Sequence, residues 1–140
     1  MTDFRVTSAL SDMNMSVIHG VLQHSYWAKG IPEATLRRAL ENSLCFGLFC
    51  GNDQIGFARM ITDKATFAYL ADVFVLESHR GQGGSKVLMQ AVMAHPELAG
   101  LRRMMLATSD AHGLYRQFGF TDLGNTGIMM EIHRPNVYQP

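Results

Sequence analysis

The stretch RGQGGSKVLM, residues 80–89, places three glycines within four positions, shortly before a lysine. Upstream of it, the apolar run TFAYLADVFVL (66–76) predicts a strand. Downstream, apolar residues at helical spacing from Val87 to Val92 predict a helix that ends near His95-Pro96. The stretch is therefore a glycine-rich turn between a strand and a helix.

Such a turn has the properties of an anion-binding loop. Glycines leave backbone N–H groups unshielded, and the N-terminus of the following helix adds about half a positive charge. Arg80 and Lys86 flank the turn with formal charges. A phosphate or a pyrophosphate is the ligand that this arrangement favours.

Two common phosphate-binding motifs do not fit the spacing. A GxxxxGK[ST] loop that starts at Gly81 needs glycine at position 86. The GxGxxG fingerprint, which Gly81 and Gly83 could begin, needs glycine at the same position. Position 86 is lysine. From the stretch alone, a flexible glycine-rich turn without a ligand remains the alternative.

The rest of the chain supplies further strands and helices. FRVTS (4–8) alternates like a strand, Asp12 can cap a helix that extends to Leu22, and Pro32 opens a second helix over 32–42. The later elements expected are a hairpin of strands 44–50 and 54–61, the strand 66–76, the helix after the glycine turn, a strand 102–108, a helix 111–118 and a last strand 127–133. This order predicts an α/β (α+β) fold with a mixed sheet and helices on its faces.

The composition indicates one globular domain, residues 1–140. Domains of roughly 100–150 residues are the commonest, and 47% apolar with 17% charged residues is typical of a folded chain. No apolar run approaches the ~20 residues of a transmembrane helix, and the N-terminus lacks the apolar core of a signal peptide. We therefore expect a cytoplasmic protein without a membrane partner.

Charge and cysteine usage argue against two further classes. Twelve basic and twelve acidic residues give a formal net charge of zero, without the basic surplus of most nucleic-acid-binding proteins. Cys45 and Cys50 lie in one predicted strand with no metal-ligand spacing around them, which indicates two reduced thiols. We expect neither a nucleic-acid partner nor a metal site.

Two stretches within residues 80–120 resemble the GCN5-related N-acetyltransferase (GNAT) family. The family signature Arg/Gln-x-x-Gly-x-Gly/Ala lies between a strand and a helix, and Arg80, Gly83 and Ser85 occupy its three positions. Ser85 departs from the usual glycine or alanine but is also small. The second stretch, AHGLYRQFGF (111–120), is similar to the family's A-x-x-LY-x-x-x-GF segment. The resemblance covers nearly the whole chain and implies the GNAT fold, a central mixed, mostly antiparallel sheet flanked by helices.

The resemblance implies acetyl-CoA as the acetyl donor and no metal. The pyrophosphate of the coenzyme would lie on the glycine turn, and its pantetheine arm would pair with the preceding strand by β-augmentation. Thr108 stands where many relatives carry an asparagine that contacts this arm. The residues implied in coenzyme binding are, in the strand, Val73, Phe74 and Val75 and, in the turn, Arg80, Gly81, Gln82, Gly83, Gly84, Ser85 and Lys86.

The resemblance also implies residues for acetyl transfer. Tyr115 matches the family's tyrosine that protonates the thiolate leaving group, and a phenol with a pKa of about 10 is protonated at neutral pH. The alternative for Tyr115 is a core aromatic on the apolar face of its helix. Asp72 is the only charge within 66–76 and is a candidate general base. The alternative for Asp72 is a buried acid that an arginine or backbone amides satisfy.

The acceptor and the assembly complete these expectations. The resemblance places the break SYWAKGIP (25–32) over the acceptor, so Tyr26 and Trp27 either contact it or anchor that segment to the core. The implied activity is transfer of acetyl from acetyl-CoA to a primary amine of a small molecule or a peptide. A catalytically silent acetyl-CoA-binding sensor or interaction module is the alternative. Many relatives dimerise, and the apolar strand 127–133 could form a homodimer interface or complete the sheet of its own chain.

Overall fold

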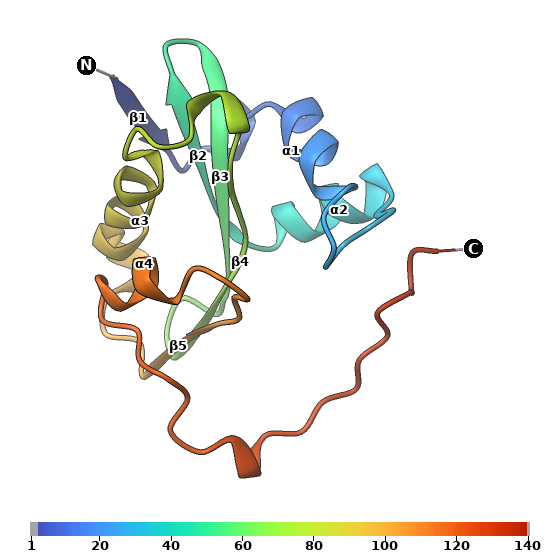
Figure 1. Cartoon of the computed structure of the whole chain (residues 1–140), viewed down its shortest axis with the longest axis vertical. Coiled ribbons are helices and arrows are strands. Elements are labelled where there is room, and N and C mark those ends of the chain that lie inside the picture. Colours follow the sequence, from blue (N-terminus) through green and yellow to red (C-terminus); the bar gives the residue numbers. More distant parts are fainter. Residues whose placement is uncertain (1–2, 140) are drawn as a thin grey trace.

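A five-stranded sheet with its strands in chain order lies at the centre of the molecule (Figure 1). Its strands are β1 (Phe4–Thr7), β2 (Leu44–Cys50), β3 (Asp53–Thr62), β4 (Phe67–Val75) and β5 (Arg103–Leu106). β1 to β4 pair antiparallel, whereas β4 and β5 pair in parallel. This is the mixed, mostly antiparallel sheet that the sequence predicts. The structure is a computed structural model that describes residues 3–139, so the first two residues and the last one of the predicted domain lie outside it.

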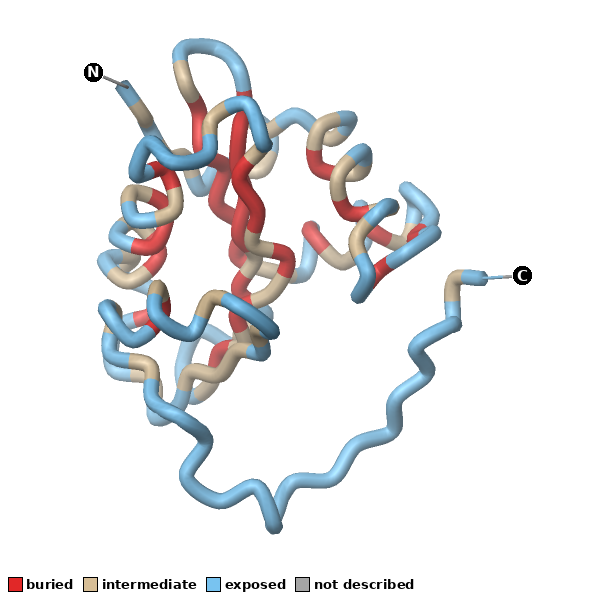
Figure 2. Tube along the Cα trace, viewed as in Figure 1, coloured by how far each residue is buried: buried red, intermediate tan, exposed pale blue. Residues whose placement is uncertain are grey.

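Helices cover both faces of the sheet (Figure 1). α1 (Met15–Leu22) and α2 (Glu33–Glu41) lie on one face, and α3 (Gly84–Ala94) and α4 (His112–Arg116) lie on the other. Two clusters of buried apolar side chains follow from this arrangement, one centred on α3 and one on α1 and α2. Figure 2 shows these buried residues along the strands and on the sides of the helices that face them. Among the described residues, no helix has the length and apolar character needed to span a membrane.

The central strands are covered on both faces, which explains their composition. β2 has the sequence LCFGLFC, and six of its seven residues are buried. A strand with helices on both sides has no solvent-facing positions, so its sequence is a continuous apolar run and does not alternate. Cys45, which is buried, and Cys50, which is half-buried, are both free thiols.

α1 begins later than the sequence predicts. Asp12, the expected cap, lies in a short 3-10 turn over Leu10–Asp12. The cap is Asn14, whose side chain accepts a hydrogen bond of 3.2 Å from the Val17 N–H. The prediction for Asp12 is wrong because a distant contact sets this helix start. The backbone N–H of Asn14 donates to the buried Gln54 side chain of β3 at 2.6 Å.

A β-bulge in β4 separates the ends of β4 and β5. Asp72 and Val73 of β4 lie opposite the single residue Ala58 of β3, and Asp72 has a left-handed backbone with φ of 57°. Bulges bend a strand and increase its twist. β4 and β5 pair only as far as Leu70 and Leu106, and β4 continues beyond that point to Val75. The last residues of β4 therefore have no paired strand on the β5 side.

The C-terminal segment does not form the strand that the sequence predicts over 127–133. Within the described residues, β5 is the last strand, and every residue from 121 to 137 is exposed. We call residues 125–139 the C-terminal arm; it leaves the α3 and α4 side of the molecule and returns toward α2 (Figure 1). Tyr138 packs against the cluster of α1 and α2. The prediction of a strand in this chain's own sheet is wrong because the arm lies beside no strand edge of its own chain.

Candidate functional site

A cavity of about 520 Å³ lies where β4 and β5 diverge. It brings together residues that are far apart in the sequence, from the segment before α2, from β4 and from the segment that leads into α4. The predicted site residues that line it are Tyr26, Trp27, Asp72, Val73, Thr108 and Tyr115. The described residues that line this cavity include no histidine, lysine or arginine, and its two charged groups are the carboxylates of Asp72 and Asp110.

The glycine turn lines a second cavity, of about 370 Å³, at the end of β4. Gly81 and Gly83 have φ of 76° and 84°, values that glycine adopts without strain. Gly84 is the first residue of α3, and a Cβ added there would lie 3.1 Å from Leu48. The predicted residues that line this cavity are Val75, Arg80, Gly81, Gly83, Gly84, Ser85 and Lys86.

The N-terminus of α3 is open toward this second cavity. Its N-cap residue is Gly83, and no side chain caps the helix. The first N–H groups of a helix have no partner within the helix, and the helix dipole adds partial positive charge there. Lys86 contributes a formal positive charge in the first turn. The turn can therefore bind an anion through its backbone amides and the positive charge of Lys86 together.

Arg80 makes a structural hydrogen bond in addition to placing a positive charge beside the glycine turn. Its Nε donates a hydrogen bond of 2.9 Å to the backbone carbonyl of Val75, which ties the glycine turn to the end of β4. Phe74, which precedes Val75 in β4, turns its buried ring to the α1 and α2 side and packs against Phe57. Only the backbone of Phe74 is thus available on the cavity side. Gln82 is the one predicted turn residue that does not line the cavity.

Tyr115 lies on α4 with its side chain only 8% exposed. Its ring contacts Phe120 edge to face, and burial, followed by the nearby carboxylate of Asp110, raises the pKa of the phenol above its ordinary value of 10.0. The side chain is thus protonated at neutral pH. It belongs to the apolar core and also lines the 520 Å³ cavity, so the two interpretations of Tyr115 are compatible.

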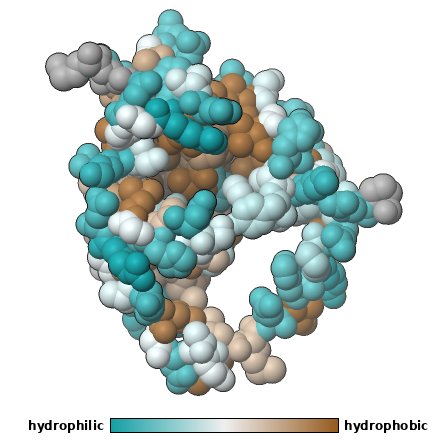
Figure 3. Space-filling view, in the orientation of Figure 1, coloured by the Kyte–Doolittle hydropathy of each residue, from teal (hydrophilic) through white to brown (hydrophobic). Residues whose placement is uncertain are grey.

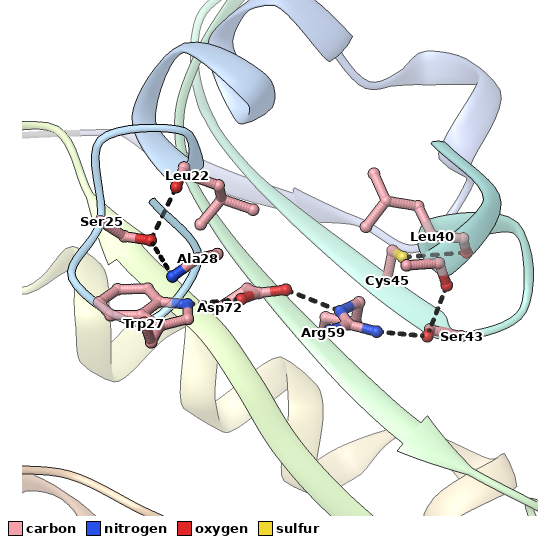
Figure 4. Close-up of polar contacts among 10 residues, drawn as sticks. Leu22, Ser25, Trp27, Ala28, Leu40, Ser43, Cys45, Arg59 and Asp72 are labelled. Atoms are coloured by element: carbon pink, nitrogen blue, oxygen red, sulfur yellow. Dashed lines mark hydrogen bonds and ion pairs between the residues drawn. The ribbon is translucent and has the colours of Figure 1, made fainter. Parts of the chain in front are cut away.

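Asp72 is the centre of a partly buried polar network (Figure 4). One carboxylate oxygen accepts a hydrogen bond from Trp27 Nε1, and the other is paired with Arg59 Nε, both at 2.7 Å. Arg59 also donates to Ser43 Oγ at 3.2 Å. The side chains of Asp72 and Arg59 are 6% and 16% exposed, so water screens their ion pair little.

Sequence reasoning missed Arg59, although the sequence holds a signal for it. Arg59 is the only charge within the apolar run 54–61, just as Asp72 is the only one within 66–76. Two lone opposite charges in consecutive antiparallel strands can face each other across the sheet. The network also links the bulge in β4 to Trp27, a residue of the segment before α2.

Three predicted residues of this cavity, Tyr26, Trp27 and Thr108, have specific neighbours. Tyr26 and Trp27 are 76% and 45% exposed, and their rings meet edge to face with centroids 5.0 Å apart. Together they form an aromatic rim on the 520 Å³ cavity. Thr108 accepts a hydrogen bond of 3.0 Å from the Ala111 N–H, so its hydroxyl helps to begin α4. Among the described residues, no three His, Cys, Asp or Glu side chains are grouped to hold a metal ion.

Comparison with known sequences identifies relatives of this chain. A sequence model of the Acetyltransferase (GNAT) family matches residues 15–120. A protein from Gibberella zeae described as a candidate acetyltransferase is 31% identical over 145 residues, which cover 86% of this chain and 80% of the relative. The family match includes both the glycine turn and the segment that contains Tyr115.

Solved structures include similar molecules. The crystal structure of a candidate acetyltransferase of the GNAT family from Xanthomonas campestris pv. campestris is 52% identical, covers 100% of this chain and 99% of its own, and superposes with a TM-score of 0.96. Because this agreement includes the whole chain, the C-terminal arm has the same course in that crystal structure. A candidate acetyltransferase from Deinococcus radiodurans shares the fold at 20% identity and a TM-score of 0.74, over 99% of this chain and 96% of its own.

Proposed function

The chain belongs to the GNAT family of acetyltransferases, and from this premise we propose that it is an acetyl-CoA-dependent N-acetyltransferase that acts on a primary amine. The observation that carries the proposal is the divergence of β4 and β5. It leaves an unpaired strand edge between the glycine turn at one end and the cavity with Tyr115 at the other. The acceptor class we propose is a small molecule or a peptide.

The residues present fit the coenzyme. The uncapped N-terminus of α3, with Lys86 beside it, suits a pyrophosphate, and the left-handed Gly83 leaves room for close approach. The backbone of Val73 and Phe74 offers hydrogen bonds on the unpaired edge of β4 for an extended amide chain. The carbonyl of Val75 already accepts a hydrogen bond from Arg80. Val75 would therefore contribute to coenzyme binding mainly through its place at the end of β4. When bound, acetyl-CoA supplies the acetyl group as an activated thioester.

Tyr115 is proposed as the general acid. Acetyl transfer forms a C–N bond to the amine and breaks the C–S bond, and the departing sulfur must receive a proton. The buried phenol of Tyr115 holds a proton at neutral pH because its pKa is raised. Its position on the cavity wall lets it deliver that proton, and general acid catalysis typically accelerates a reaction by roughly 100- to 10,000-fold.

For Asp72 the geometry favours a positioning role. Both carboxylate oxygens have partners, one the indole of Trp27 and the other the guanidinium of Arg59. A carboxylate engaged in this way has a fixed direction. We propose that Asp72 fixes the bulge in β4 and holds Trp27 at the rim of the cavity. The proton of the amine would then leave through water or another base.

The lining of the cavity supports an amine as the acceptor. Its charged groups are carboxylates, and aromatic rings form its rim, so an ammonium group is attracted to it before deprotonation. Asp72 is already neutralised by Arg59, whereas Asp110 is exposed and has no ion-pair partner among the described residues. The rings of Tyr26 and Trp27 offer an apolar surface to the rest of the acceptor.

Calorimetric titration of the purified chain with acetyl-CoA, with ATP and NAD as controls, tests the donor. We expect selective binding of acetyl-CoA that Gly83→Asp abolishes, because a carboxylate would project into the anion site. Gly100→Asp is the matched control: both glycines have positive φ, 84° and 76°, and neither has an atom within 4 Å of an added Cβ. The strain of about 1–2 kcal/mol is then similar in both variants.

Either of two results would contradict the donor assignment. One is the absence of binding to every CoA thioester, including longer acyl chains. The other is equal loss of binding in the Gly83→Asp and Gly100→Asp variants, since strain alone would then explain it. Binding of acetyl-CoA without turnover on a panel of primary amines would favour the sensor alternative over the enzyme.

A further inference from the structure

The aromatic rim of the 520 Å³ cavity lies on a segment that forms neither helix nor strand. This segment, SYWAKGIP (25–32), connects α1 to α2, and we call it the rim segment. Tyr26 and Trp27 are 76% and 45% exposed, whereas Ala28 and Ile31 are buried in the cluster of α1 and α2. The positions of the two exposed rings therefore depend on the contacts that hold the rest of the segment.

Hydrogen bonds to α1 and β4 hold the rim segment against the body of the molecule. The backbone N–H of Gly30 donates to the carbonyl of Gln23, at the end of α1, at 2.8 Å. Trp27 Nε1 donates to the carboxylate of Asp72 in β4 at 2.7 Å. Neither contact involves the C-terminal arm, so we expect the rim segment to stay folded when a residue of the arm is changed.

The end of the C-terminal arm makes a further contact with this part of the molecule. Figure 3 shows open space between the arm and the body. Of the described arm residues 125–139, Tyr138 alone is partly buried, and it packs against the cluster of α1 and α2. Turn hydrogen bonds of 3.2 and 3.0 Å, donated by the N–H groups of Val137 and Gln139, set the backbone on either side of it. The contact of Tyr138 is thus locally supported.

Gly30 is the point where the arm meets the rim segment. A Cβ added to Gly30 would lie 3.2 Å from the carbonyl oxygen of Tyr138 and 3.8 Å from its Cβ, so the two backbones are close. Gly30 also has φ of 82°, a conformation that residues with a side chain rarely adopt. Two separate requirements therefore favour glycine here, only three positions from Trp27 in the sequence.

We propose that Tyr138 is a positioning residue for the acceptor, which holds the rim segment from the side of the arm and thereby fixes Tyr26 and Trp27 at the cavity. Tyr138 does not itself line the cavity, so it would act through these two rings. Fixing a loop before its ligand binds increases affinity, because less conformational entropy is lost on binding. The inference rests on the proposed function, since it takes the rim as the surface that meets the acceptor.

The fluorescence of Trp27, the single tryptophan of the chain, reports on the rim segment without any ligand. We expect Tyr138→Ser to shift the emission to longer wavelength and to increase quenching by acrylamide, because Trp27 becomes more mobile and more exposed. Tyr138→Phe keeps the ring and should behave as the wild type does. Val137→Ser changes an adjacent residue that is 59% exposed, so it is the matched control and should leave the emission unchanged.

A second set of variants tests the contact at Gly30. Gly30→Ala places a Cβ against the Tyr138 carbonyl, whereas Gly100→Ala, at a similar φ of 76°, places one in open space. We expect Gly30→Ala to change the Trp27 emission and Gly100→Ala to leave it unchanged. The effect of Gly30→Ala should be smaller when Tyr138→Ser is also present, since neighbours in contact give non-additive effects. Additive effects would contradict the contact.

Steady-state kinetics tests the consequence for the acceptor. Tyr138→Ser should raise KM by roughly 2- to 10-fold for a primary amine with an apolar or aromatic group, which needs the rim. The KM of a short alkylamine should change less, and kcat should stay close to the wild-type value because the cavity wall with Tyr115 is untouched. Tyr138→Phe should restore the wild-type KM.

Three results would overturn the proposal. Unchanged emission and quenching in Tyr138→Ser would mean that the arm does not hold the rim segment. A changed emission with an unchanged acceptor KM would mean that the acceptor does not use the rim. An equal rise in KM for large and short amines would point to a change in the whole cavity. Failure of the proposed function is separate: the wild type would then bind no CoA thioester in calorimetry, while Trp27 would still report on the arm.

Discussion

Burial sets the protonation of two side chains on opposite faces of the sheet. Tyr115 and Cys45 are both nearly enclosed by apolar neighbours, and burial raises the pKa of each because it disfavours the charged form. For Tyr115 this keeps a proton available next to the cavity. For Cys45 it keeps the thiol neutral and unreactive, which is the behaviour of a structural cysteine.

Replacement of Tyr115 by phenylalanine tests the acid. Tyr115→Phe removes one hydroxyl and keeps the ring in the core, so the fold and the affinity for acetyl-CoA should change little. We expect kcat to fall by roughly 100- to 10,000-fold. Tyr69→Phe, at a second tyrosine on the same cavity, should keep most of its kcat. Steady-state kinetics on an accepted amine measures both; a fully active Tyr115→Phe would leave Tyr115 as a packing residue only.

The Cys45 thiol predicts how stability depends on pH. Burial raises its pKa from 9.0 to about 11, with opposing effects from Arg59 and Asp72. Above pH 9 the thiol ionises in the unfolded chain but not in the folded one, so its contribution is complete below pH 9 and is lost as the pH rises toward 11. The loss should approach about 3 kcal/mol.

Urea unfolding of the wild type and of Cys45→Ala measures this contribution. The difference in free energy of unfolding between the two proteins should shrink as the pH rises, because the other titrating groups are common to both. A difference that stays constant across this pH range would mean that the buried thiol titrates normally.

Among the elements, β4 determines the shape of the site. Its bulge at Asp72 bends the strand away from β5, and the unpaired edge that results runs directly into the glycine turn. Three contacts hold this geometry: Asp72 with Arg59, Asp72 with Trp27, and Arg80 with the Val75 carbonyl. Each joins β4 to another element, so the cleft is a property of several elements together.

A double substitution separates positioning from catalysis at Asp72. Asp72→Asn alone leaves the buried Arg59 charge unpaired and should cost about 3–5 kcal/mol of stability. Asp72→Asn combined with Arg59→Met removes that charge, and the asparagine oxygen can still accept the hydrogen bond from Trp27. If Asp72 is a positioning residue, the double variant should regain both stability and kcat. Stability that returns without kcat would instead identify Asp72 as the general base; urea unfolding and steady-state kinetics give the two values.

In the molecule as a whole, the two faces of the sheet carry different parts of the candidate site. The face with α1 and α2 carries the Asp72 network and the aromatic rim, and the face with α3 and α4 carries the glycine turn and Tyr115. The cleft opens between them because β4 and β5 separate. The C-terminal arm joins the two sides again by passing outside the body (Figure 1).

The sequence by itself determined the features that depend on neighbouring residues. The glycine turn, the helix that follows it and the helix with Tyr115 were all predictable, because positive φ at Gly83 and apolar spacing are local requirements. The order of strands and helices also followed from local patterns, and it led to the correct fold class. The segment 127–133 has an equally clear strand pattern, yet it forms no strand within the described chain.

Only the tertiary structure decided the features that need a distant partner. The sequence offers a general base or a buried acid at Asp72, and only the fold brings Arg59 and Trp27, 13 and 45 residues away, into contact with it. The start of α1 was set by Gln54 on β3, 40 residues away. The last apolar run shows the same principle, since alternation makes a segment suited to a strand but only an adjacent strand edge makes it one. A pattern in the sequence fixes what a segment can pair with, and the fold decides whether that partner is within reach.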